Sequence, residues 1–338
     1  MINRYLTICL IGLLSAFTVA SHTSVAIADE SATRQTGAGE NYLFTEILQL
    51  SNAYFGRFPF MRAEDVYAKI IQGDDTSYLL VSVQSPEEYS KGHVPGAINI
   101  PLGEIAEAKS LSLLPPGKKI VFTCDNGHRS MVAALFFGQL GYETYAMSMG
   151  LSYWNGAGAG ISSPYPGSAG YPVSIVSISP PRNHTPPTIA GTGGRETIIA
   201  RTGAIVANER NLFIDRNEVY AKAVQGGDPS YFLVSLQSRE DYSKGHVPGA
   251  INIPVSEFAK AESLSKLPRD KKIVLICYVG HWGGSAALFL NQLGYEAYDM
   301  RFGTLGWNDA TDGLGAAKGY LLSLGKSLEL PVEKGRQQ

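Results

Sequence analysis

The sequence predicts an α/β protein of two tandem domains, each a mostly parallel sheet covered by helices on both faces. The first observation is a repeat. From about residue 64 the chain matches itself at an offset of 153 residues without a gap, and residues 89–101 are identical to residues 242–254. The second observation is that short apolar runs alternate with segments of helical periodicity in each copy. This alternation is typical of parallel strands joined by helical crossovers.

Six elements are expected in the first copy, in the order strand, helix, strand, strand, helix, strand. They cover residues 78–83, 85–91, 97–100, 119–124, 131–140 and 143–147. Ser85 and Ser130 are each followed by a helical pattern and are expected to cap the two helices. The two copies should form separate sheets, related by an approximate two-fold axis.

The rest of the chain divides around the two copies. We expect a signal peptide over 1–28, an N-terminal segment over 29–57, domain 1 over 58–156, a Gly- and Pro-rich linker over 157–210, domain 2 over 211–310 and a C-terminal tail over 311–338. Helical spacing predicts a helix over 41–57 and a small helical tail around 314–330. Residues 156–195 of this region should be extended and run over the outside, with a strand-like segment at 173–178.

The N-terminus has the pattern of an export signal. Arg4 precedes an apolar run over 5–20, and Ala-Ile-Ala at 26–28 precedes Asp29. An uncleaved membrane anchor is the alternative, although the run is shorter than the ~20 residues of a typical span. We therefore expect an exported protein, periplasmic or secreted, with no membrane span after cleavage.

Composition limits the possible partners. Without residues 1–28 the chain has 27 Lys and Arg against 30 Asp and Glu, and no basic patch that would indicate nucleic-acid binding. No cofactor is expected and no metal, because His93 and His246 lack partner ligands at suitable spacing.

Cys124 and Cys277 remain after cleavage. A disulfide between them is the alternative to two free thiols, which we expect because they occupy equivalent positions.

Cys124 is expected where a strand ends and a helix begins. A tight turn there would point backbone N–H groups inward, as an anion-binding nest at the positive end of the helix. The helix end and a cation lower a cysteine pKa from its usual value of about 8.5. Arg129 supplies the cation and a fork that suits a sulfonate. The alternative is a buried structural cysteine. The expected anion-binding loop is Asp125, Asn126, Gly127, His128 and Ser130.

Residues 124–130, Cys-Asp-Asn-Gly-His-Arg-Ser, resemble the active-site loop of rhodaneses, the thiosulfate sulfurtransferases. Four residues separate the cysteine from the arginine in that family, whereas related dual-specificity phosphatases have five, so the loop length favours sulfur. Residues 87–101 resemble the family's second signature, which supports the fold and whose histidine, His93 here, is not catalytic. The resemblance covers both copies.

The sequence departs from that family at the end of the first strand of each copy. Rhodaneses usually carry Asp and Arg there, but this chain has Ser82 and Gln84, and again Ser235 and Gln237. Neutral groups can replace a buried ion pair with little effect on stability, so the fold is not in doubt. The substrate preference is open.

The second loop is expected to be an impaired site, formed by Cys277, Gly280, His281 and Trp282. Trp282 replaces Arg129 and offers one N–H donor without charge. Gly283 and Gly284 should loosen the helix start, and Ser285 would cap it two residues later.

The resemblance implies a sulfurtransferase. The Cys124 thiolate would take the outer sulfur of thiosulfate or polysulfide as a persulfide and pass it to cyanide or a thiol acceptor. The alternative is a carrier or interaction module that holds sulfur or selenium for a partner without turnover.

Overall fold

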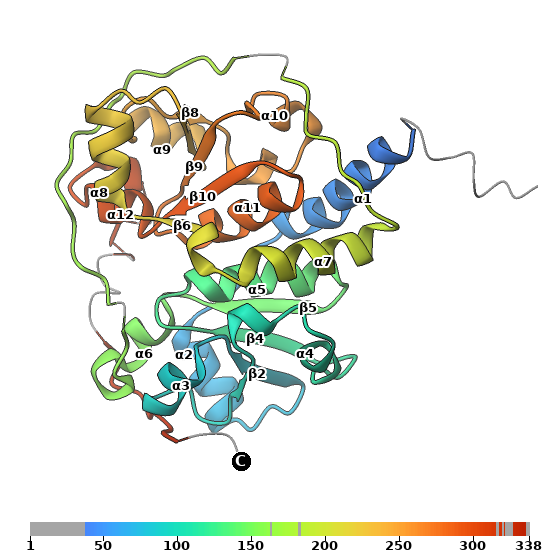
Figure 1. The fold of residues 1–338 in the computed structure, drawn as a ribbon. Helices are drawn as coiled ribbons and strands as arrows, with labels where there is room; N and C mark the ends of the chain where they lie inside the picture. Colours follow the sequence, from blue (N-terminus) through green and yellow to red (C-terminus); the bar gives the residue numbers. More distant parts are fainter. Residues whose placement is uncertain are drawn as a thin grey trace, which may run out of the picture. The chain divides into compact units, whose positions relative to one another are not determined.

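The computed structural model describes residues 38–162, 164–181, 184–315, 318–319, 321 and 327–335. The two copies form two separate five-stranded sheets, of order β1-β5-β4-β2-β3 and β6-β10-β9-β7-β8 (Figure 1). Every strand pair in both sheets is parallel. The predicted fold class, two tandem parallel-sheet α/β units, is confirmed.

Equivalent elements appear in the two copies. The strands of the first are β1 (Phe60–Met61), β2 (Tyr78–Ser82), β3 (Ile98–Asn99), β4 (Lys119–Thr123) and β5 (Glu143–Met147), and its helices are α1 (Ala38–Phe55), α2 (Ala63–Asp65), α3 (Pro86–Lys91), α4 (Ala108–Ser112), α5 (His128–Gln139) and α6 (Gly150–Ala159). The strands of the second are β6 (Phe213–Ile214), β7 (Tyr231–Ser235), β8 (Ile251–Asn252), β9 (Lys272–Ile276) and β10 (Glu296–Met300), and its helices are α7 (Gly194–Val206), α8 (Arg216–Glu218), α9 (Arg239–Lys244), α10 (Ala261–Leu264), α11 (His281–Gln292) and α12 (Gly303–Trp307).

The two predicted helix caps have different outcomes. Ser85 caps α3 in a capping box with Glu88, as the sequence predicts. The prediction for Ser130 is wrong, because α5 begins earlier, at His128, after a left-handed Gly127. Ser130 therefore lies inside the first turn and its hydroxyl donates to the Gly127 carbonyl.

Helices α5 and α11 pack against each other between the two sheets, with α1 and α7 beside them (Figure 1). Gln139 of α5 and Gln292 of α11 are equivalent in the repeat, and their amides exchange hydrogen bonds of 2.7 and 2.9 Å. This reciprocal pair marks an approximate two-fold axis. Because α5 contacts its sheet on one side and helices on the other, it is buried along nearly its whole length.

Helix α1 confirms the helix predicted near 41–57, whereas α7 corrects the linker prediction. Residues 194–206 fall within the linker predicted over 157–210, but they form a helix that buries Ile198 and Val206. The Pro and Gly residues that favour an extended chain lie mainly before this segment. Residues 171–181 have almost no regular structure and run along the outside of the second copy, as expected for a linker (Figure 1).

Two segments connect the copies crosswise, because each follows one copy in the chain and contacts the other. The linker contacts the second copy, where Ser174 pairs with His246 and the Trp307 indole donates to the Pro172 carbonyl. The end of the chain contacts the first copy in the same way: Glu333 pairs with His93, and the Trp154 indole donates to the Pro331 carbonyl. Residues 327–332 have no regular secondary structure, which corrects the end of the helical tail predicted around 314–330, whereas the described residues 318, 319 and 321 are helical.

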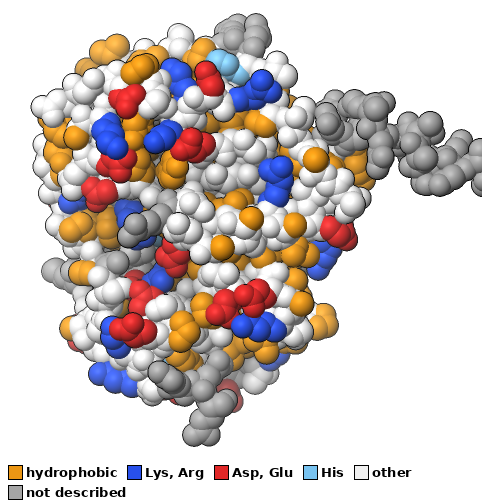
Figure 2. Space-filling model, in the orientation of Figure 1, with side chains coloured by type: hydrophobic (Ala, Val, Ile, Leu, Met, Phe, Trp, Pro, Cys, Tyr) orange, Lys and Arg blue, Asp and Glu red, His pale blue; other side chains and the backbone are white. Residues whose placement is uncertain are grey.

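Charged side chains are mixed in sign on the face drawn in Figure 2, and among its described side chains no basic patch gathers there. Among the described residues, no helix combines the length and apolar character needed to cross a bilayer. The expected signal peptide over 1–28 lies outside the described residues.

Candidate active site

Cys124 follows the last residue of β4, at the carboxyl edge of the first sheet, and faces the start of α5. Its Sγ accepts the backbone N–H groups of Gly127 at 3.1 Å and Ser130 at 3.4 Å. Gly127 has a φ of 91°, a left-handed conformation that favours glycine, and it turns the chain into the helix. The sulfur is thus held by backbone donors at the positive end of α5, where a thiolate or persulfide is stabilised. It is fully buried.

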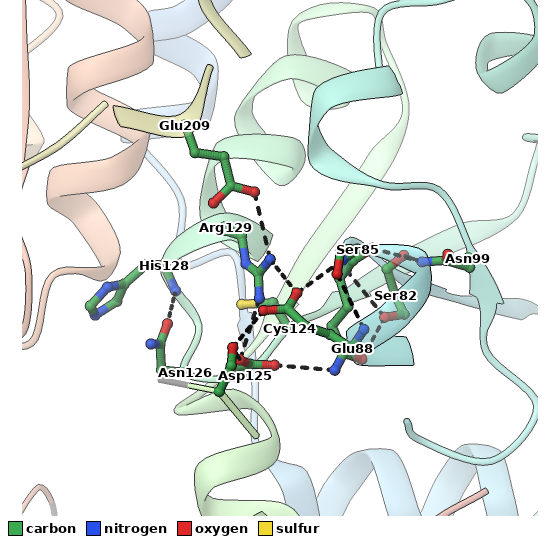
Figure 3. A network of polar contacts seen from close by, with 12 residues as sticks. Ser82, Ser85, Glu88, Asn99, Cys124, Asp125, Asn126, His128, Arg129 and Glu209 are labelled. Carbon is green, nitrogen blue, oxygen red and sulfur yellow. Dashed lines mark hydrogen bonds and ion pairs between the residues drawn. The ribbon is translucent and has the colours of Figure 1, made fainter. Parts of the chain in front are cut away.

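Arg129 lies beside this sulfur and is surrounded by carboxylates (Figure 3). Its Nη1 lies 2.7 Å from Glu88 and 3.5 Å from Glu209, and its Nη2 lies 3.4 Å from Asp125. Burial alone would lower the pKa of Arg129, but the charges of Cys124, Glu209 and Glu88 raise it above its usual value. Burial would also raise the pKa of Glu88, but Arg129 outweighs it and lowers that pKa to about 2. The Arg129 guanidinium, which was expected to hold an oxyanion, is therefore already paired with carboxylates of the protein.

Gln84 holds one of the carboxylates that surround Arg129. It occupies a position where rhodaneses usually have a charged residue, and its amide nitrogen donates to Asp125 at 3.1 Å. Ser82 in turn donates to the Gln84 amide oxygen at 2.8 Å. The Ser162 hydroxyl lies 2.6 Å from a Glu88 oxygen, to which it donates, and 3.1 Å from an Asp125 oxygen. Of the two neutral replacements, Gln84 thus holds Asp125, one of the three acids that pair with Arg129, and Ser82 holds Gln84.

His128 does not contribute to an anion-binding loop around Cys124. Its ring points away from the sulfur (Figure 3), and its Nε2 lies 2.9 Å from the Val279 carbonyl in the second copy. The equivalent His281 does the reverse, with Nε2 at 3.1 Å from the Asn126 carbonyl. The two cysteine loops therefore hold each other through a reciprocal pair of histidines.

The second loop keeps the geometry of the first, contrary to the predicted loosening. Helix α11 begins at His281, the equivalent of His128, and the Cys277 Sγ accepts the Gly280 N–H at 3.0 Å. Ser285 does not cap this helix, because its hydroxyl donates to the Met131 carbonyl of the first copy. Gly283 and Gly284 are held by packing, which overrides their low helix propensity.

Chemically the second loop differs from the first. Trp282 packs edge-on against Tyr54 and Phe60 and supplies no cation. Burial and the nearby Asp299 raise the pKa of the Cys277 thiol to about 11. Cys277 also lines a cavity of about 170 Å³. Both cysteines are free thiols in the structure, as expected, and not a disulfide.

Three acids that lie near Arg129 or Cys277 were missed from the sequence. Glu88 lies within the recognised 87–101 segment, but its pairing with Arg129 depends on the fold. Glu209 comes from the segment between the copies, where no motif indicates it. Asp299 could have been noticed, because an acid in a buried strand replaces Ala146 at the repeat offset. Within the described part of the chain, no group of three His, Cys, Asp or Glu residues could hold a metal ion.

Comparison with known proteins gives matches in both copies. The model of the rhodanese-like domain matches residues 63–157 and 217–310. A putative sulfurtransferase, YtwF of Bacillus subtilis, is 33% identical over 86 residues, which are 25% of this chain and 81% of YtwF. Thiosulfate sulfurtransferase PspE of Escherichia coli is 32% identical over 71 residues, 21% of this chain and 68% of PspE. A putative sulfur carrier protein, YrkF of B. subtilis, is 34% identical over 83 residues, 24% of this chain and 44% of YrkF.

Proposed function

Because the chain belongs to the rhodanese-like domain family, we propose that it transfers sulfane sulfur through a persulfide on Cys124. The observation that carries this proposal is the pair of backbone N–H groups, from Gly127 and Ser130, that the sulfur accepts at the N-terminus of α5. These donors and the helix dipole stabilise negative charge on the sulfur as a thiolate and as a persulfide. Sulfur transfer is also the activity in the names of YtwF and PspE.

The reaction proceeds in two steps. The Cys124 thiolate attacks the outer sulfur of thiosulfate or a polysulfide, and the donor's S–S bond breaks so that sulfite or a shorter polysulfide leaves with the electron pair. Cyanide or a thiol then attacks the outer sulfur of the persulfide, and the product leaves while Cys124 returns as a thiolate. Arg129, whose charge acts on Cys124, stabilises the donor and the leaving sulfite.

The donor gains access when the ion pairs of Arg129 rearrange, since Cys124 has no exposed surface. Glu209 is the most accessible of the three partners, with 38% of its side chain exposed, and its pair is also the longest. A sulfonate can replace Glu209 on the fork without disturbing the shorter pair to Glu88.

A second candidate function is a sulfur carrier that is loaded by a partner protein and does not turn over thiosulfate. Three carboxylates around one arginine favour it, because their net negative charge disfavours a dianionic donor. The relative YrkF is named a putative sulfur carrier. Selenium could be held on the same thiolate.

Thiocyanate formation from thiosulfate and cyanide distinguishes the two functions. A sulfurtransferase produces thiocyanate catalytically, Cys277→Ser retains most of that activity, and Cys124→Ser retains almost none. A carrier gains one sulfur on Cys124, visible by mass spectrometry, but forms no thiocyanate beyond one equivalent. Turnover that survives in Cys124→Ser would refute both.

We also propose that residues 1–28 direct export and are removed, so that the protein acts in the periplasm or outside the cell. The pattern of Arg4, an apolar run and Ala-Ile-Ala supports this. The N-terminal sequence of the protein recovered from each cell fraction tests it. An N-terminus near Asp29 in the exported fraction is expected, and an intact Met1 in the cytoplasm would contradict it.

A further inference from the structure

A small cavity, which we call the interface pocket, lies beside the loop of Cys277. Its volume is about 170 Å³. Phe58, Phe60 and Met149 line it from the first copy, and Cys277 and Trp282 line it from the second. Because its walls come from both copies, the interface pocket forms where the copies pack against each other.

The residues that line the interface pocket differ in a consistent way from their equivalents in the repeat. Asp125, Asn126 and Arg129 of the Cys124 loop, together with Asn211 and Arg301, correspond to Tyr278, Val279, Trp282, Phe58 and Ser148. These last five residues all line the pocket. Three charged and two amide side chains are thus replaced by four aromatic or aliphatic side chains and one serine. The exchange removes charge from this one space at several separate positions of the chain.

The apolar replacements do not close the space, as they would if they only completed the core. A cavity remains, and Phe58, which lines it, keeps 76% of its surface exposed. The pocket therefore opens to solvent beside Phe58. An exposed phenyl ring forgoes hydrophobic stabilisation, and the walls of a void lack dispersion contacts. An apolar ligand in the pocket would supply both.

Charge and size limit the ligands that the interface pocket can accept. Its described lining residues include no Lys, Arg, Asp or Glu, and His281 is neutral because burial lowers its pKa to about 4. A charged ligand would therefore lose its hydration without gaining a counterion. The volume is close to the ~150 Å³ of an engineered apolar cavity that holds one benzene molecule. An uncharged ligand with one ring fits both limits.

The side chains of the interface pocket are suited to an aromatic ring. Phe60 meets Trp282 edge-on with the ring centroids 5.3 Å apart, and it lies 4.8 Å from Phe58. Aromatic rings favour such edge-to-face and offset contacts, and a methionine sulfur, here that of Met149, packs well against a ring. Ser148 can pair with one ligand hydroxyl, because its side chain has no hydrogen bond to the described residues.

We propose that the interface pocket binds a small uncharged aromatic compound with a single ring, of the phenol class. Three observations carry this proposal: a cavity of the volume of one ring, the lack of charge among its described lining residues, and the exchange of five charged or amide side chains at the repeat offset. The site goes beyond the sulfur transfer proposed for Cys124, and it requires no chemistry at Cys277.

The test titrates the full chain, as recovered from the cell, with 4-fluorophenol and follows the fluorine NMR signal of this ligand. A dissociation constant of about 0.1–1 mM is expected, because so small a ligand has few atoms to bind with. 4-Fluorobenzoate has the same ring but carries a negative charge. It should bind at least about tenfold more weakly, because the pocket offers no counterion.

Two variants place the binding in the interface pocket. Ser148→Arg introduces the residue type of its equivalent, Arg301, and should weaken binding of 4-fluorophenol at least about tenfold, because it brings a charge to the pocket. Phe58→Asn removes an exposed ring, so the melting temperature should stay within about two degrees of the parent. It should weaken binding about threefold to tenfold, since one aromatic wall is lost.

Tyr42→Asn is the matched control for Phe58→Asn. Tyr42 is also an exposed aromatic residue but does not line the pocket, so the affinity for 4-fluorophenol should not change. The proposal would be overturned by absence of binding up to about 10 mM, by equal affinities for the two ligands, or by an affinity that neither Ser148→Arg nor Phe58→Asn changes. None of these measurements uses thiosulfate or Cys124, so failure of the Cys124 function and failure of this site are distinguishable.

Discussion

At the scale of single residues, the first prediction concerns stability. Ser130 and Ala146 of the first copy correspond to Gly283 and Asp299 of the second. Gly283→Ser alone should destabilise the protein by ~1–3 kcal/mol, because the new Cβ overlaps the Asp299 carboxyl in a packed interior. Adding Asp299→Ala should recover most of this loss, since the serine then has the neighbour that Ser130 has. Urea unfolding of the two single variants and the double variant measures the coupling.

The matched control is Gly284→Ser, one residue further along the same helix. Its Cβ would meet the His128 backbone and Val132 rather than the carboxyl. Asp299→Ala should therefore not recover the stability of Gly284→Ser. Additive effects of Gly283→Ser and Asp299→Ala would mean that the two side chains do not share one space.

A second residue-scale prediction concerns Glu209. Glu209→Gln should lower the KM for thiosulfate about two- to fivefold with little change in kcat, because it removes one anion that competes for Arg129. The difference should shrink at high salt, which screens a partly exposed pair. Initial rates at low and high ionic strength measure both effects. Glu257→Gln, which removes a carboxylate paired with Arg239, is the control and should leave KM unchanged. A KM that rises in Glu209→Gln would show that Glu209 does not compete with the donor.

At the scale of elements, the sequence predicted what local patterns determine. Apolar runs gave β2, β4 and β5 closely, and the capping box at Ser85 gave the start of α3. The edge strands β1 and β6 have only two residues each, so they have no pattern of their own. The start of α5 was misplaced because a left-handed glycine, and not a serine, ends the turn after Cys124.

The candidate site, too, was predictable only where local sequence patterns determine it. The repeat and the loop spacing singled out both cysteines, which the structure places just before equivalent helix starts, and Arg129, which lies in the first turn of α5. The surroundings of Arg129 were not predictable, since Glu88 and Glu209 lie 41 residues before and 80 residues after it in the chain. Such contacts depend on how the copies pack, and local patterns carry no information about that.

A prediction at the scale of elements concerns the end of the chain, which contacts the first copy. Removing residues 327–338 should destabilise the first copy by a few kcal/mol, at ~1 kcal/mol for each net hydrogen bond. It deprives the Trp154 indole, the Asn155 amide and both backbone groups of His93 of their partners. Urea unfolding followed by tryptophan fluorescence measures the loss. Removing 336–338 alone is the control, and an equal effect of both truncations would contradict the role of the segment.

At the scale of the whole molecule, the two copies are held together partly by neutral histidines, so their association should weaken in acid. Burial lowers the pKa of His281 from 6.5 to about 4, and burial together with the charge of His281 lowers that of His128 as well. A histidine whose pKa is lower in the folded chain favours folding above its unfolded pKa. That contribution is lost as the pH falls from about 6.5 toward 4. Each tenfold change in proton affinity is ~1.4 kcal/mol, so His281 alone contributes about 3 kcal/mol.

The measurement is the melting temperature between pH 7.5 and pH 4.5, at about half-unit intervals, for the parent and for His128→Gln/His281→Gln. Glutamine can still donate to the Val279 and Asn126 carbonyls but does not titrate in this range. The parent should lose stability steadily below pH 6.5, and the variant should lose clearly less over the same interval. His184→Gln is the control, because this residue lies in the linker away from both loops, and it should follow the parent. Parallel curves for the parent and the double variant would mean that acid acts on other groups and that the reciprocal histidines do not govern how the two copies hold together.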